Sequence, residues 1–335
     1  NKQKTNSENL INIMNKVKCK LIVGLHDIEI DNNIDLKKGI ELDTNVFLTN
    51  NKKVIEELIP EKIIPGMGLS EYNNLLSLNA IVYTIVEIPE KAFNERTILI
   101  NFLDLNAILC QAFWLIKDNS VRMELGHLIY EKGNRLGLHS NYLSSMYTTQ
   151  LGKQIPKKFN INELQTLGRF QKFLFDTLKN KTEQTYTSLV KEHNRVQRAF
   201  LFIQSARCAD DIGIKVAELC TAFECLFSVS TSELKHRLSE IISITIGKDK
   251  TEKLIIYKHI QKAYDLRSAV VHGDSIPSRY SKMEFQLLKE TVNNCDNYLR
   301  LVFNKFISDE ELFSVFTENS KDELQSYFLN LIFED

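Results

Sequence analysis

The chain of 335 residues is 43% hydrophobic and 25% charged, with a formal net charge of −1. These values are ordinary for a soluble globular protein with room for two domains, and only 5 prolines and 12 glycines argue against long flexible linkers. No uninterrupted apolar run reaches the roughly 18 residues of a membrane helix. The polar first residues predict no signal peptide. We therefore expect a cytoplasmic protein without a membrane partner.

The first part of the chain predicts a mixed α/β domain over residues 1–155, which would act as a sensor or position a substrate. Residues 1–15 are polar and are expected to be helical or frayed. Runs of β-branched residues bounded by Asp- and Asn-rich turns predict strands at 21–23, 28–30, 40–42, 46–48 and 80–88. An apolar stretch predicts a buried helix over 98–116, with Trp114 in the core. Residues 118–150 give no clear prediction.

The second part predicts an all-α bundle over residues 156–335, beginning where Pro156-Lys157-Lys158 interrupts the pattern. Apolar periodicity predicts helices at 160–179, 182–208, 212–229, 232–247, 250–272 and 279–306. Capping boxes are expected at Asn160/Glu163, Ser308/Glu311 and Ser320/Glu323, and the last two would start short acidic helices. The expected fold class is α+β: a mixed α/β domain followed by a helical bundle.

Charge is distributed unevenly along the bundle. Residues 157–305 carry 24 Lys and Arg against 17 Asp and Glu, a net charge of +7. Residues 306–335 carry 1 against 8, a net charge of −7. A positive bundle suits a polyanion such as RNA, and an acidic tail could screen it. The alternative is that both are solvated helix faces.

Arg267 and His272 form the most informative pair in the chain. Histidine transfers protons near neutral pH, and arginine grips phosphate with two parallel hydrogen bonds. Gly273 stands where a left-handed residue would end the helix over 250–272. Positions five apart on a helix diverge by about 140°. A break at His272–Gly273 would release the histidine from helical geometry and let it approach the arginine.

The same spacing occurs once more, at Arg122 and His127. No helix stop follows this second pair, so we interpret it as two surface residues on a helix. Because two occurrences are compatible with chance, the spacing of Arg267 and His272 alone decides nothing. The alternative for that pair is an arginine near a helix end and a histidine with a structural role.

Three ordered segments give the pair a context: Ile214–Phe227, Glu233–Glu240 and Tyr264–Gly273. Together they resemble the Apea-like HEPN domains, in which one helix ends near AxExLF, a second opens with EL and a third closes on YxLRSxxxHG. The match covers roughly residues 160–305. Cys220 and Cys225 depart mildly from the pattern, since that helix more often carries aliphatic residues there.

The resemblance implies a homodimeric helical bundle that often acts as a metal-independent endoribonuclease. Arg267 and His272 would be the catalytic residues, with Ser268, Glu224 and Tyr264 in supporting positions. It implies RNA as the partner, no metal and no cofactor, and a role in prokaryotic antiviral defence or as a toxin of a toxin–antitoxin pair. The alternative is a non-catalytic HEPN module for dimerisation, RNA binding or regulation. The N-terminal domain could then bind a ligand or a protein trigger. Cys-x-x-Cys spacing is lacking, so the six cysteines predict free thiols rather than a zinc site.

Overall fold

The computed structural model describes residues 16–31, 34–178, 187, 189, 193–229 and 233–333. The chain forms two compact units. The sheet unit comprises residues 1–112, 121–145 and 156–172, and the helical unit comprises 113–120, 146–155 and 173–335. We expected one boundary at 155/156. Instead, two short segments from the first half of the chain belong to the helical unit, and residues 156–172 belong to the sheet unit.

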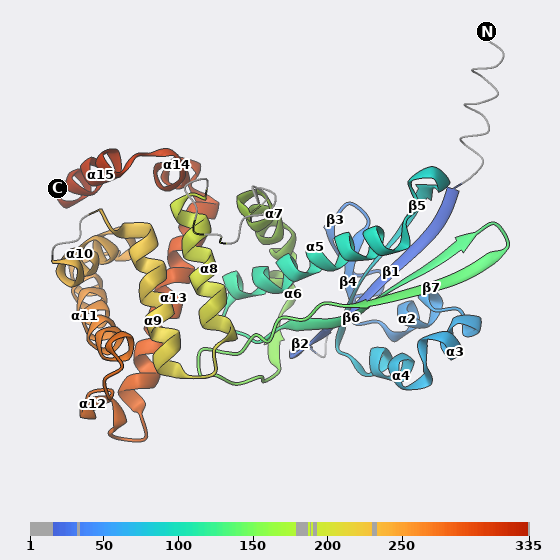
Figure 1. The fold of residues 1–335 in the computed structure, drawn as a ribbon, viewed down its shortest axis with the longest axis horizontal. Coiled ribbons are helices and arrows are strands. Elements are labelled where there is room, and N and C mark those ends of the chain that lie inside the picture. The colour runs from blue at the N-terminus through green and yellow to red at the C-terminus, as the bar shows by residue number, and fades with distance from the viewer. Residues whose placement is uncertain are drawn as a thin grey trace, which may run out of the picture. The chain divides into compact units, whose positions relative to one another are not determined.

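The sheet unit is built on a six-stranded antiparallel sheet with strand order β3-β4-β5-β1-β6-β7 (Figure 1). A separate parallel pair joins β2 to β8. The strands are β1 (Lys16–His26), β2 (Ile28–Ile30), β3 (Ile40–Asp43), β4 (Val46–Thr49), β5 (Ala80–Pro89), β6 (Arg122–Lys132), β7 (Arg135–Tyr142) and β8 (Lys157–Phe159). The strands expected between residues 21 and 88 are confirmed. The expectation for residues 1–15 falls outside the described residues.

Helices cover both faces of this sheet. The helices α2 (Lys52–Leu58), α3 (Ile64–Met67) and α4 (Leu69–Ser77) supply side chains to one apolar cluster with Ile22, Ile81 and Ile129 of the strands. Helix α5 (Glu95–Ile116) packs closely against β6, because a Cβ added at Gly126 would lie only 2.6 Å from Cδ2 of Leu103. The expected helix over 98–116 is therefore confirmed, and its interior role explains its apolar sequence.

Helix α5 is long and apolar enough to cross a membrane, and it is the one such helix among the described residues. No uninterrupted apolar run had been expected to reach that length. In the structure 56% of its most apolar window is buried. Burial of this kind is typical of a core helix in a soluble protein. Trp114, near its end, is fully buried as expected.

The β6–β7 hairpin lies within residues 118–150, which have no clear sequence prediction. Its two-residue turn is Gly133-Asn134, and Gly133 has a φ of +58°. A glycine with positive φ at the first position of such a turn suits the twist of a hairpin. The Gly-Asn pair between two alternating runs is thus a hairpin signal.

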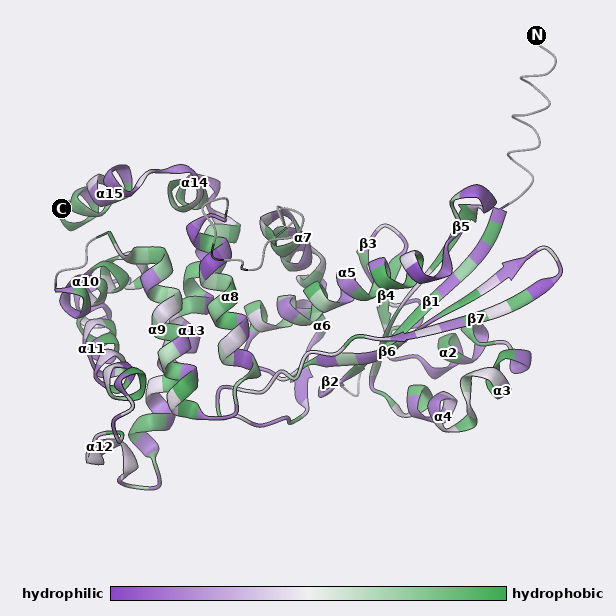
Figure 2. Ribbon diagram, in the orientation of Figure 1, coloured by the Kyte–Doolittle hydropathy of each residue, from purple (hydrophilic) through white to green (hydrophobic). Residues whose placement is uncertain are grey.

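The helical unit consists of helices around the largely apolar α9 (Figure 2). Helix α6 (Ile161–Gln165) and the first half of α7 (Leu167–Leu178) belong to the sheet unit. The described helices of the helical unit are the rest of α7 and α8 (Arg195–Cys208), α9 (Ile212–Phe227), α10 (Leu234–Ile246), α11 (Lys250–His272), α12 (Ser278–Ser281), α13 (Gln286–Ser308), α14 (Glu310–Glu318) and α15 (Lys321–Phe333). Helix α11 has the predicted bounds. The single helix expected over 279–306 is two helices, because Met283, Glu284 and Phe285 all adopt positive φ.

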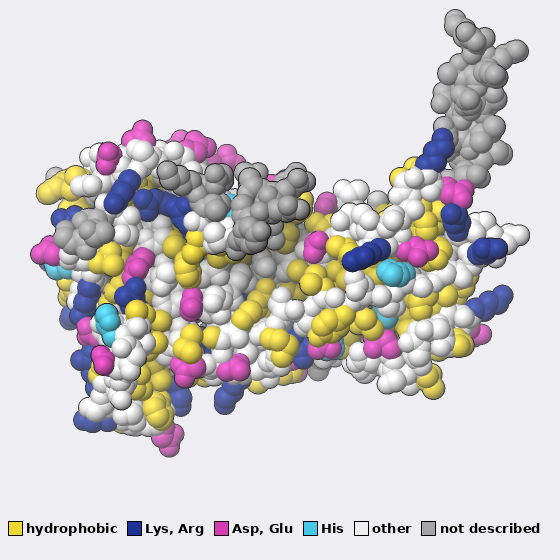
Figure 3. Space-filling model, viewed as in Figure 1, with side chains coloured by type: hydrophobic (Ala, Val, Ile, Leu, Met, Phe, Trp, Pro, Cys, Tyr) yellow, Lys and Arg dark blue, Asp and Glu magenta, His cyan; other side chains and the backbone are white. Residues whose placement is uncertain are grey.

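The two acidic terminal helices, α14 and α15, pack on the core of the helical unit. The ring of Phe316 lies 5.4 Å from that of Phe227 and 4.9 Å from that of Phe306. Phe328 lies 6.1 Å from Phe227. Acidic side chains gather on the outside of these helices (Figure 3). The tail therefore contributes apolar core on one face and solvated charge on the other.

Two of the three expected capping boxes are present, at Asn160/Glu163 and Ser320/Glu323. The third is wrong. Ser308 is the last residue of α13, and Asp309 caps α14 by accepting a hydrogen bond from the Leu312 amide at 2.9 Å. A carboxylate directly before the acidic first turn thus replaces the expected serine as the cap.

Candidate functional site

Helix α11 carries the candidate residues and ends in a Schellman motif. Gly273 has φ 74° and ψ 17°, its amide donates to the carbonyl of Val270 at 3.2 Å, and the Asp274 amide donates to Ala269 at 2.9 Å. These are the two hydrogen bonds of that motif, and glycine adopts the left-handed conformation without a steric penalty. The expected role of Gly273 as the residue that ends the helix is confirmed.

The expected release of His272 from the helix is wrong. His272 is the last helical residue, because the Schellman bonds hold the chain in helical geometry up to it. Its side chain is exposed. Side chains five positions apart on a continuous helix point about 140° away from each other. Within one chain, therefore, Arg267 and His272 do not face each other.

Arg267 instead points to Glu224 on helix α9. One guanidinium nitrogen, Nη2, lies 3.3 Å from Oε1 and 3.5 Å from Oε2 of Glu224. The two side chains are 27% and 20% exposed. The buried Nε of Arg267 has no hydrogen-bond partner among the described residues. This ion pair joins two of the three motif segments but leaves part of the guanidinium without a bond.

The neighbouring motif residues have structural contacts. The buried hydroxyl of Tyr264 donates to the carbonyl of Cys220 at 3.3 Å, and burial raises the pKa of Tyr264 well above its usual value. Asp265 receives bonds from Lys235 and Arg279; burial alone would raise the pKa of Asp265, but these two cations lower it. Ser268 is exposed. We name Glu224, Tyr264, Arg267, Ser268 and His272 the motif site.

A second group of charges in the helical unit was not expected from the sequence. Lys215 of α9 is 2% exposed, and its ammonium donates to Oγ1 of Thr148 at 2.8 Å and to the carbonyl of Ala206 at 2.7 Å. On α13, Asp296 pairs with Arg300 and accepts a hydrogen bond from Nε1 of Trp114 at 2.7 Å. We name Asp118, Arg207, Lys215, Asp296 and Arg300 the Lys215 cluster.

Burial dominates the electrostatics of this cluster. It lowers the pKa of Lys215 to about 8, although the carboxylates of Asp118 and Asp296 oppose the shift. It also raises the pKa of Asp118 to about 6, with a further contribution from the charge of Asp296. The cavity beside these groups measures about 10 Å³. That is about the space of one water molecule, so the cluster has no room for a substrate.

The second Arg–His pair lies on a strand, not on a helix as expected. His127 of β6 is fully buried, and its Nδ1 lies 2.8 Å from Oγ of Ser140 while its Nε2 lies 3.4 Å from Oε1 of Glu71. Arg122 pairs with Glu124 at 3.0 Å. Both ring nitrogens of His127 thus have partners, as a buried histidine requires.

The six cysteines are free, and four of them are buried. Among the described residues, no group of three or more His, Cys, Asp or Glu side chains could hold a metal ion. Burial raises the pKa of Cys220 well above its usual value and that of Cys225 to about 11. A raised pKa disfavours the reactive thiolate, so these two thiols on α9 are poor nucleophiles.

No family model, curated protein or solved structure matches this chain.

Proposed function

We propose that the chain is a metal-independent endoribonuclease of the HEPN type that acts through Arg267 and His272. One observation carries the proposal: Glu224 engages only one end of the Arg267 guanidinium, and the same helix presents an exposed His272 on its last turn. An arginine with unused donors can bind a phosphate, and an exposed histidine can exchange protons with a substrate.

The proposed reaction is attack of a ribose 2′-OH on the adjacent phosphate. His272 takes or gives the proton, and Arg267 stabilises the charge on the phosphorane-like transition state. The products are a 2′,3′-cyclic phosphate and a 5′-OH. The supporting residue Glu224 orients Arg267, Tyr264 anchors α11 to α9, and Ser268 is an exposed hydroxyl beside the arginine.

A homodimer suits this reaction better than a single chain. Arg267 and His272 diverge on one helix, so a second copy would have to bring its own pair to the same phosphate. Two histidines could then divide the roles of base and acid. We place this activity in the cytoplasm, in prokaryotic antiviral defence or toxin–antitoxin biology, which rests on analogy with the family.

A non-catalytic HEPN module is the second candidate, and a specific observation favours it. The Arg267–Glu224 ion pair, the Tyr264 hydrogen bond and the Asp265 bridges all give the motif residues structural contacts within one chain. In this version the same surface binds RNA or a second copy without cleaving anything.

The test is cleavage of single-stranded RNA by the full chain in EDTA. We expect His272→Ala to lower the rate by about 100-fold or more, as for loss of a general acid or base. Arg267→Ala should lower it by a similar factor. Product analysis should show 2′,3′-cyclic phosphate ends.

Two variants provide matched controls. His236→Ala and Arg237→Ala remove exposed side chains of the same types from α10, and both should cleave at the wild-type rate. If wild type and His272→Ala cleave RNA equally, the activity comes from a contaminant and not from the motif site. RNA binding without cleavage by any form would establish the non-catalytic candidate.

A further inference from the structure

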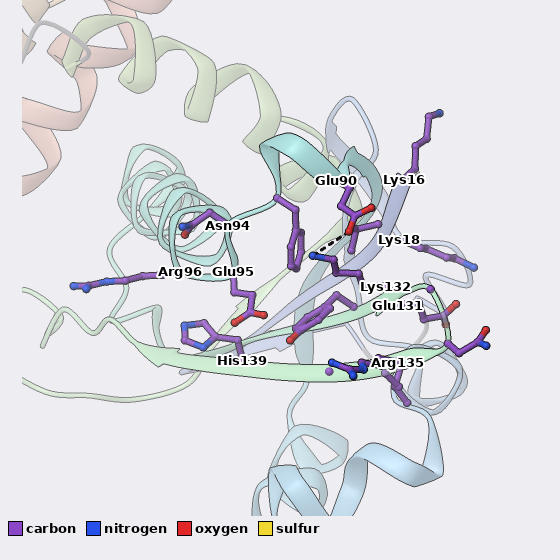
Figure 4. A pocket seen from close by; sticks show the side chains of 17 residues that line it. Lys16, Lys18, Glu90, Asn94, Glu95, Arg96, Glu131, Lys132, Arg135 and His139 are labelled. Atoms are coloured by element: carbon purple, nitrogen blue, oxygen red, sulfur yellow. Dashed lines mark ion pairs between the residues drawn. The ribbon is translucent and has the colours of Figure 1, made fainter. Parts of the chain in front are cut away.

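The sheet unit contains an open hollow between the start of α5 and the β6–β7 hairpin (Figure 4). Its volume is about 1190 Å³. Pockets for small molecules commonly measure about 300–1,000 Å³. The hollow is therefore large enough for a small-molecule ligand, and it lies on a different unit from the motif site.

Two aromatic rings form one wall of this hollow. Tyr130 pairs across the hairpin with Gly137, and a Cβ added there would lie 2.1 Å from Cζ of Tyr130. Only glycine lets the ring lie over the neighbouring strand. The Phe93 ring packs at 4.9 Å from it, tilted by 55°. Both rings remain partly exposed, so they offer a fixed aromatic surface.

The position of Tyr130 is fixed at its hydroxyl as well. A hydrogen bond to the carboxylate of Glu95 raises the pKa of Tyr130. Glu95 begins helix α5, which itself packs against β6. Gly137 and Glu95 therefore both constrain the hydroxyl end of the Tyr130 ring.

The rest of the hollow is mainly cationic. Five Lys or Arg side chains line it against three Glu. Two of the three glutamates are engaged: Glu95 by Tyr130, and Glu90 by the Lys132 ammonium at 3.2 Å. Arg96 and Arg135 are exposed and have no ion pair within the parts of the chain that the structure describes. Arg96 points away from the hollow in Figure 4, so of these two arginines Arg135 is the one that is free to bind an anion there.

We propose that this hollow binds a nucleotide, with the base against Tyr130 and Phe93 and the phosphate held by Arg135. Aromatic side chains stack on any base because every base has a π-face, and guanidinium groups bind phosphate with two hydrogen bonds. The ligand is a free nucleotide or the phosphorylated end of a single strand, which share this chemistry. The proposal does not depend on RNA cleavage by the motif site.

Calorimetric titration of the full chain tests the ligand class. The probes are AMP, adenosine, inorganic phosphate and a 5′-phosphorylated hexanucleotide. We expect AMP to bind more tightly than adenosine or phosphate, because only AMP uses both the rings and Arg135. If the hexanucleotide binds more tightly than AMP, the ligand is the phosphorylated end of a strand. If AMP binds more tightly, the ligand is a free nucleotide. Phosphate binding as tightly as AMP would overturn the stacking role, and no binding by any probe would overturn the proposal.

Matched variants locate the ligand. Gly137→Ala should displace the Tyr130 ring and weaken AMP binding by about tenfold or more. Gly66→Ala is its control, since the nearest atom to an added Cβ there is 3.9 Å away. Arg135→Ala should weaken binding by about tenfold and reduce its dependence on salt, whereas Lys62→Ala, an exposed cation elsewhere in the sheet unit, should not.

Tyr130→Phe keeps the ring and removes its hydroxyl, so this variant should bind AMP nearly as well as wild type. Thermal unfolding of each variant shows whether the hairpin still folds. If both Gly137→Ala and Arg135→Ala bind AMP with wild-type affinity, the proposal is wrong, whatever the ribonuclease assay shows. RNA cleavage should be unchanged in either variant, because neither residue belongs to the motif site.

Discussion

The Lys215 cluster and the motif site both contain partly buried charges in the helical unit, and helix α9 contributes to each. In the Lys215 cluster the ammonium has two short bonds, and Asp296 is bonded by both Arg300 and Trp114. In the motif site Arg267 contacts Glu224 through one nitrogen, at 3.3 Å. Buried groups with short bonds to two partners, such as Lys215 and Asp296, stabilise a fold, whereas a partly satisfied pair near the surface retains capacity for a ligand.

Removing Lys215 should have the largest effect on stability. Lys215→Met removes the ammonium that donates to the Ala206 carbonyl and to Thr148, so we expect the free energy of unfolding to fall by about 3 kcal/mol. Trp114, the single tryptophan, lies in the helical unit and reports its unfolding by fluorescence in urea. The exposed Lys248→Met on the same unit is the control. A loss below about 1 kcal/mol would show that the cluster does not stabilise the unit.

Asp118 should make the stability of the helical unit depend on pH. Its pKa is raised from 3.8 to about 6 in the folded state, chiefly by burial. Between these two pH values the folded chain keeps a proton on Asp118 that the unfolded chain loses. The contribution of Asp118 to the free energy of unfolding is therefore fully present below pH 4, and it is lost as the pH rises to about 6. The free energy of unfolding should change with pH by about 2 kcal/mol less in Asp118→Asn than in wild type. This is less than the full pKa shift of Asp118 implies, because the side chain is partly exposed.

Urea unfolding at pH 4.5 and pH 7, again followed by Trp114 fluorescence, measures this difference. Asp274→Asn changes an exposed carboxylate of the same unit and should leave the dependence as it is in wild type. An unchanged dependence in Asp118→Asn would mean that Asp118 titrates alike in the folded and unfolded chains.

The motif site should contribute least to stability. Arg267→Met removes a single long contact between partly exposed side chains, so the expected loss is about 1 kcal/mol. The same variant should abolish RNA cleavage under the proposed function. A loss of about 3 kcal/mol with unchanged RNA binding would instead make the arginine a structural residue like Lys215.

Short sequence patterns predict those helices and strands whose bounds depend on residues close together in the chain. Helix α11 has the predicted bounds because its apolar spacing and Gly273 act within a few residues of each other. The β6–β7 hairpin has a comparable local signal in its turn residues Gly133-Asn134. The prediction that His127 lies on a helix is wrong, since the residue lies on strand β6 of that hairpin.

The Lys215 cluster could not be predicted because its members are distant in sequence. Asp118, Lys215 and Asp296 come together only through tertiary packing, and no short motif joins them. The same holds for the division into units, since Asp118 and Thr148 belong to the helical unit although both precede the expected boundary. For the motif site, the sequence predicts that Arg267 and His272 approach each other, whereas the continuous helix holds them apart.

The hydrogen bond from Trp114 to Asp296 also has a consequence during synthesis. The two residues are 182 positions apart. At translation rates of about 5–20 residues per second, Asp296 is synthesised roughly 9–36 seconds after Trp114. In that interval the indole and the segment around it are exposed apolar surface on a nascent chain. The helical unit should therefore depend on chaperones more strongly than the sheet unit, whose central strands are already complete by residue 142.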